Sequence, residues 1–127
     1  MQNRKINAEI APQPASAYSQ AYEVSGSTRT LYISGQLGID ADGTTPPDVA
    51  AQARLAWRNL GAQLAAADMG FENLVRVTMI ISNAAEIPAS RPARAEALGD
   101  HRPASTVIVA ALADSNWKIE IEGVAQA

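Results

Sequence analysis

The feature that most restricts the fold is an amphipathic segment in the middle of the chain, with β-forming runs on both sides. Its apolar residues recur at steps of three, four and seven: Val49, Ala53, Ala56, Trp57, Leu60, Leu64 and Ala67. This spacing is typical of a helix with one buried face. A hydroxyl at Thr45, a proline at Pro46 and a carboxylate at Asp48 predict its start, and Gly70 predicts its end.

The remaining segments predict strands and one further helix. Strand-like runs occupy residues 3 to 9, 21 to 24, 29 to 34, 74 to 82, 106 to 112 and 117 to 124. Turn residues at 25 to 28 predict a hairpin between the second and third runs. A second helix is predicted from Ser90 to Leu98, because Pro92 is tolerated only in a first turn and Gly99 ends it. This order predicts an α+β fold, a mixed six-stranded sheet with two helices on one face.

The last predicted strand has two different faces. Ile119 and Ile121 point to one side, and Lys118, Glu120 and Glu122 point to the other. If the isoleucines contact the helices, the charged row faces either water or a partner subunit.

Composition excludes several classes of function. Ten Lys and Arg against thirteen Asp and Glu give a net charge of -3, without a basic cluster, which argues against nucleic acid as a partner. The absence of cysteine and the single histidine, His101, argue against thiol chemistry and a metal site, so we expect no metal and no cofactor. The first residues lack a signal-peptide apolar region, and no run is long enough to span a membrane. We therefore expect a single domain over residues 1 to 127, located in the cytoplasm.

Four short motifs identify a resemblance that covers roughly residues 5 to 125. They are Tyr18-Ser19-Gln20-Ala21, Ile33-Ser34-Gly35-Gln36, Pro103-Ala104-Ser105-Thr106 and Ile119-Glu120-Ile121-Glu122. In this order and spacing the chain resembles the Rid (YjgF-like) family. The resemblance implies a fold similar to a small chorismate mutase and a homotrimer joined through the open faces of the sheets. It also implies cofactor-independent hydrolysis of enamines and imines, with release of ammonia, at clefts between subunits.

The same resemblance implies the site residues. Glu120 is the expected catalytic carboxylate, which orients and partly deprotonates a water. Tyr18 and Ser34 are expected to hydrogen-bond the substrate. The segment Ala104, Ser105 and Thr106 is expected to offer backbone N–H groups that polarise the reacting group.

One departure from the family pattern affects substrate binding. Deaminases of the family carry an arginine directly after the Pro-Ala dipeptide, where it pairs with the substrate carboxylate. Here Ser105 follows Ala104, and a hydroxyl does not replace a guanidinium. Arg91 and Arg94, which lie three apart on the second predicted helix, and Arg102 are the candidate replacements.

Two other functions stay open at this stage. The missing arginine favours a non-catalytic trimer that binds a small metabolite or a protein partner through the same clefts. Translational inhibition or RNA cleavage has also been attached to parts of the family. The acidic balance and the lone histidine make it the least favoured of the three.

Overall fold

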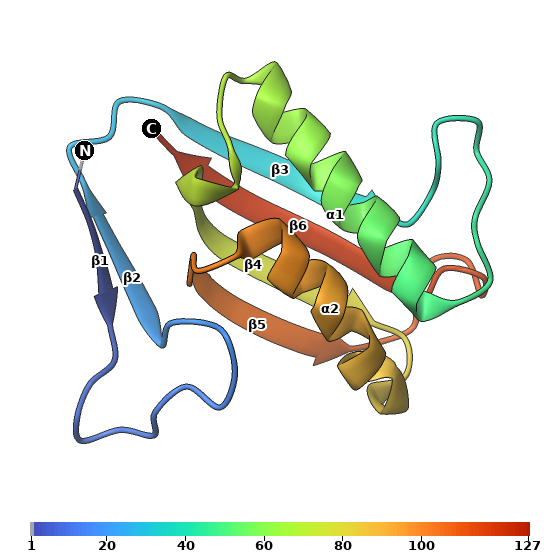
Figure 1. Ribbon diagram of the computed structural model, residues 1–127, viewed down its shortest axis with the longest axis horizontal. Coiled ribbons are helices and arrows are strands. Elements are labelled where there is room, and N and C mark those ends of the chain that lie inside the picture. Colours follow the sequence, from blue (N-terminus) through green and yellow to red (C-terminus); the bar gives the residue numbers. More distant parts are fainter. Residues whose placement is uncertain (1) are drawn as a thin grey trace.

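The computed structural model describes residues 2–127 and contains two α-helices packed on one face of a four-stranded sheet (Figure 1). The described elements are β1 (Gln2–Ile6), β2 (Ala21–Ser25), β3 (Thr30–Leu37), α1 (Val49–Ala66), β4 (Leu74–Ile81), α2 (Ile87–Leu98), β5 (Ala104–Val109) and β6 (Ile119–Gln126). The sheet order is β3-β6-β4-β5, in which only β4 and β5 run parallel. The predicted α+β class, with both helices on one face of a mixed sheet, is confirmed.

The long helix begins and ends at positions slightly different from those predicted. Asp48, not Thr45, is the N-cap, because its extended backbone lets its carboxylate accept the Ala51 N–H at 2.7 Å. At the other end the left-handed residue is Asp68, with φ 56°, and Gly70 has an ordinary negative φ. Asp68 therefore takes the terminating conformation that the sequence pattern gave to glycine.

The second helix starts earlier than predicted, at Ile87, and contains Pro92 in its interior. Pro92 has no N–H to donate to the Pro88 carbonyl. Because Pro88 lies in the first turn, the missing hydrogen bond is near the start of the helix. In the same turn the Ser90 hydroxyl donates to the Ile87 carbonyl at 2.7 Å. Gly99 ends the helix as predicted, with φ 55°.

The core lies between the two helices and the sheet. Its buried members include Ala53, Ala56, Trp57, Leu60 and Leu64 from α1, Val77, Met79 and Ile81 from β4, and Ile119 and Ile121 from β6. The two-faced character predicted for the last strand is confirmed, because Ile119 and Ile121 are fully buried whereas Glu122 is exposed. The face of the sheet opposite the helices stays uncovered in one chain, where Tyr32 is 79% exposed.

The predicted hairpin between residues 21 to 24 and 29 to 34 is wrong. β2 pairs antiparallel with β1, and β3 pairs antiparallel with β6, so the six strands form two sheets and not one (Figure 1). Gly26, with φ 73°, lies where the chain leaves β2. The N–H groups of Thr28 and Arg29 then donate to the Ala127 carbonyl, both at 2.9 Å, which directs β3 to β6.

Candidate functional site

A cavity of about 320 Å³ lies where α2, β5 and the loop before β2 meet. Tyr18, Arg91, Arg94 and Ser105 line it, so it unites predicted site residues from three separate segments. Its apolar wall includes Met79 and Val107. The cavity is on the helix side of the sheet, because Met79 is buried beneath the helices.

The loop that carries Tyr18 is fastened to the start of β5. The Ser19 hydroxyl donates to the Arg102 carbonyl at 2.5 Å, and the Ser19 N–H donates to the Pro103 carbonyl at 3.2 Å. The Tyr18 phenol oxygen accepts the Ala15 N–H at 3.3 Å. Because that bond uses only a lone pair of the phenol, its proton remains available to a ligand.

Arg94 is the most unusual group in the cavity. It is only 7% exposed, and its Nη2 donates to the Ser16 hydroxyl at 3.0 Å. Among residues 2–127, no carboxylate lies within ion-pair distance of it. Burial lowers the pKa of Arg94, and the nearby charges of Arg91 and Arg102 lower it further. A buried cation without a counter-ion is costly unless an anion joins it.

Ser105 and Thr106 lie on opposite faces of the sheet. In the parallel register Ser105 is level with Val77, which is buried under the helices, and Thr106 is level with Thr78. The Thr106 hydroxyl accepts from Arg76 Nη2 at 3.3 Å on the uncovered face. Only the Ser105 side chain therefore belongs to the cavity. Ala104, one residue earlier, shares the face of Thr106.

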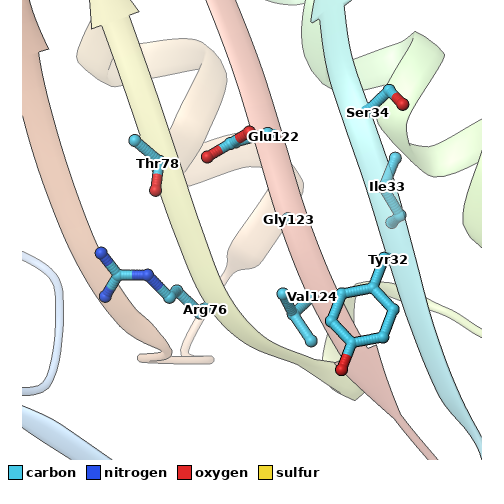
Figure 2. Close-up of a pocket in the computed structure, with 8 residues that line it drawn as sticks. All are labelled: Tyr32, Ile33, Ser34, Arg76, Thr78, Glu122, Gly123 and Val124. Atoms are coloured by element: carbon cyan, nitrogen blue, oxygen red, sulfur yellow. The ribbon is translucent and has the colours of Figure 1, made fainter.

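The uncovered face carries a second pocket, of about 340 Å³, which includes Ser34. Figure 2 shows Ser34 and Tyr32 on β3, Glu122 on β6, and Thr78 and Arg76 on β4. Glu122 was not among the predicted site residues. The signal that could have found it is its place two residues after Glu120, on the same face of one strand.

Glu120 lies on this same face, at the position level with Ile80 on β4 and Leu37 on β3. Its carboxylate rests against Gly35, where an added Cβ would lie 2.5 Å from the carboxyl carbon. Gly35 thus makes room for Glu120, which is half-buried. The glycine of the Ser34-Gly35-Gln36 motif therefore has a positioning role that the sequence pattern did not reveal.

The structure brings the predicted residues together in two groups. Tyr18, Arg91, Arg94 and Ser105 share the cavity, whereas Glu120 and Ser34 lie across the sheet from it, on the opposite face. Within one chain, no described pocket holds members of both groups.

Within residues 2–127, no group of three or more His, Asp or Glu side chains is placed to hold a metal ion. None of the helices in this range combines the length and the apolar character needed to cross a membrane.

Comparisons with known proteins match nearly the whole chain. The model of the Endoribonuclease L-PSP family matches residues 8–127. The chain is 33% identical over 122 residues to a 2-iminobutanoate/2-iminopropanoate deaminase of Rattus norvegicus, covering 94% of this chain and 87% of that protein. It is 34% identical over 124 residues to the protein of that name from Capra hircus, covering 96% of this chain and 88% of the other.

The solved structures agree with the sequence matches. The crystal structure of YyfB from Yersinia pestis, described as a protein of unknown function of the conserved Rid family, has a TM-score of 0.87 and 31% identity, with each chain covered completely. A family match of this extent, together with the shared fold and the motifs around Tyr18, Ser34, Ala104 and Glu120, shows that the chain belongs to the Endoribonuclease L-PSP (Rid) family.

Proposed function

We propose that this protein is a cofactor-independent imine hydrolase that releases ammonia from 2-imino acids. The observation that carries the proposal is Arg94, a buried cation without a counter-ion in a cavity that also holds Tyr18 and Ser105. Such a cavity favours a small anion such as a carboxylate. Relatives at 33% and 34% identity that are named 2-iminobutanoate/2-iminopropanoate deaminases support the reaction type.

The proposed active form is a homotrimer, in which Glu120 and Ser34 of one copy complete the cavity of its neighbour. Two features support assembly. The sheet face that bears Glu120 is uncovered in one chain. The edge strand β5, beside the cavity, exposes Val107, Ile108 and Val109 by 39%, 44% and 50%. An exposed apolar edge strand promotes aggregation, and an oligomer interface prevents this by covering it.

In this proposal the arginine of α2 replaces the one that the family carries after Pro-Ala. Arg94 binds the substrate carboxylate with the donors that Ser16 leaves free. The Tyr18 phenol donates to the substrate, and Ser105 contributes a second hydroxyl. The backbone of Ala104 to Thr106 is not counted among the donors, because Ser19 forms a parallel bridge to Ala104 and covers this edge of β5.

The reaction then requires one water and one proton shuttle. Glu120 holds a water against the imine carbon and accepts one of its protons as the oxygen adds to the C=N bond. Both protons of the water pass in turn to nitrogen, the C–N bond breaks, and the oxygen becomes the carbonyl of a 2-oxo acid. Water and imine are consumed, and ammonia and the 2-oxo acid are formed, so the atoms balance without a cofactor.

RNA cleavage, which the family's name denotes, is not favoured by the residues. The chain's single histidine, His101, has Nε2 bonded to the Leu74 carbonyl at 2.7 Å and packs edge-on against Tyr22. Its Nε2 is therefore engaged in the structure. The net charge of -3 also opposes binding of a polyanion.

The test of the proposal supplies 2-imino acids generated in situ by an amino-acid oxidase and follows ammonia release. We expect acceleration over buffer, abolished by Glu120→Gln without a change of assembly size in analytical ultracentrifugation. Glu96→Gln, which removes an exposed carboxylate on α2, is the matched control and should keep the rate. No acceleration with any imine would contradict the proposal and favour the non-catalytic binding module. Unfolding or dissociation of Glu120→Gln would refute Glu120 as a site residue.

A further inference from the structure

The cavity holds two cations and no acid of its own. Arg91 and Arg94 lie three residues apart on α2, a spacing that places both on one face of the helix, and both line the cavity. Arg91 lowers the pKa of Arg94, so the two charges are close enough to repel. None of the lining residues, all of which belong to the described range 2–127, is Asp or Glu.

One monocarboxylate does not balance this charge. Together, Arg91, Arg94 and a neighbouring copy's Glu120 carry a net charge of about +1. A 2-imino acid with one carboxylate and a protonated imine is neutral, whereas one with a second carboxylate carries about -1. Only the second makes the occupied site neutral, and uncompensated charge in a partly buried site is costly.

We infer that the preferred substrates are 2-imino acids that carry a second carboxylate on a short side chain. This inference rests on the proposed imine hydrolysis and adds the substrate class. Arg94, buried in the wall, binds the carboxylate next to the imine. Arg91, exposed at the mouth, binds the distal one.

The rest of the cavity fits such a molecule. Met79 and Val107 offer an apolar wall for the methylene carbons between the two carboxylates. The Ser90 hydroxyl already donates its proton to the Ile87 carbonyl, so towards a ligand it can act only as an acceptor. It therefore adds no donor that could bind a second anion. The volume of about 320 Å³ is at the small end for ligand pockets, which suits four- and five-carbon acids.

The test compares kcat/KM for imines generated from dicarboxylic and from short monocarboxylic 2-amino acids. We expect the dicarboxylic imines to be preferred by about tenfold or more. Arg91→Gln should lower kcat/KM for them by about 5- to 50-fold, the range for loss of a partly exposed charged hydrogen bond, and should leave monocarboxylic imines within about threefold. Arg58→Gln, which removes an exposed arginine of α1 outside this cavity, should change neither.

Two results would overturn the inference while the proposed function stands: equal or faster turnover of monocarboxylic imines, or an equal effect of Arg91→Gln on both classes. If no imine is turned over, the proposed function fails instead. Calorimetric titration with a stable 2-oxo dicarboxylate and a 2-oxo monocarboxylate then decides the ligand class. Tighter binding of the dicarboxylate, lost in Arg91→Gln, would support the inference, and equal or no binding would overturn it.

Discussion

Replacing Arg94 by methionine is expected to stabilise the protein and to destroy its activity. When a side chain as buried as Arg94, which is 7% exposed, has a purely structural role, its truncation lowers stability. Arg94 differs because no carboxylate among residues 2–127 pairs with it and because burial and two neighbouring arginines lower its pKa. A lowered pKa in a base means that the fold disfavours its charged form, and this cost persists throughout neutral pH.

The magnitude follows from what methionine keeps and removes. Methionine retains an unbranched stem of similar length, so the packing around this side chain changes little. The one lost hydrogen bond, at 3.0 Å to Ser16, costs little because Ser16 is exposed and its hydroxyl can bond water. Replacing buried charge by an apolar side chain gains about 1 to 2 kcal/mol. For a chain of this size each kcal/mol raises Tm by about 3 to 6 °C.

The catalytic loss is expected to be much larger than the gain in stability. Two charge-assisted hydrogen bonds to the substrate carboxylate are worth together about 3 to 4 kcal/mol, which corresponds to a fall in kcat/KM of about 100- to 1000-fold. Thermal unfolding at one fixed protein concentration and imine kinetics measure the two effects. Arg94→Lys, the matched control, keeps the charge without the fork and should gain no stability.

Two results would refute this reasoning. A fall in Tm of several degrees for Arg94→Met would mean that the guanidinium holds the loop before β2 in place and that the protein tolerates its charge for that reason. Full activity of a stably folded Arg94→Met variant would mean that the substrate carboxylate binds elsewhere.

Other predictions follow from close packing and from the faces of β5. Gly35→Ala should displace the flexible Glu120 carboxylate and lower kcat by about tenfold or more, with little change in Tm. Gly38→Ala should instead lower the free energy of unfolding by about 1 to 3 kcal/mol in urea denaturation, because its Cβ would lie 2.5 Å from the backbone of Gln52. Gln52→Leu should cost about 2 to 4 kcal/mol by the same measurement, because its buried amide makes three hydrogen bonds to backbone groups. Ser105→Arg, although this side chain lines the cavity, should not raise kcat/KM for monocarboxylic imines, because Arg94 already binds the substrate carboxylate; a clear rise would mean that Arg94 does not fill that role.

The sequence determined the local elements because their signals lie within a few residues. The 3.6-residue period around Trp57 and Leu60 set the buried face of α1, and alternation at Ile119 and Ile121 set the inner face of β6. Strand pairing was not determined locally. The turn at Gly26 had the chemistry of a hairpin, but β3 pairs with the distant strand β6, in the register Thr30 with Gln126, 96 residues apart. Pairing with a distant strand outweighs local turn propensity when that pairing buries a larger apolar face.

The candidate site was likewise determined in part by the sequence and in part by the tertiary structure. The motifs named Tyr18, Ser34, Ser105 and Glu120 as candidates, because their order and spacing resemble those of the Rid family. Only the tertiary structure decided that Ser105 faces the cavity while Glu120 faces away from it, since this depends on which side of the sheet the helices cover. It also decided that Arg94 is buried without a counter-ion. A single arginine in a sequence gives no sign of its burial, because burial is a property of everything packed around it.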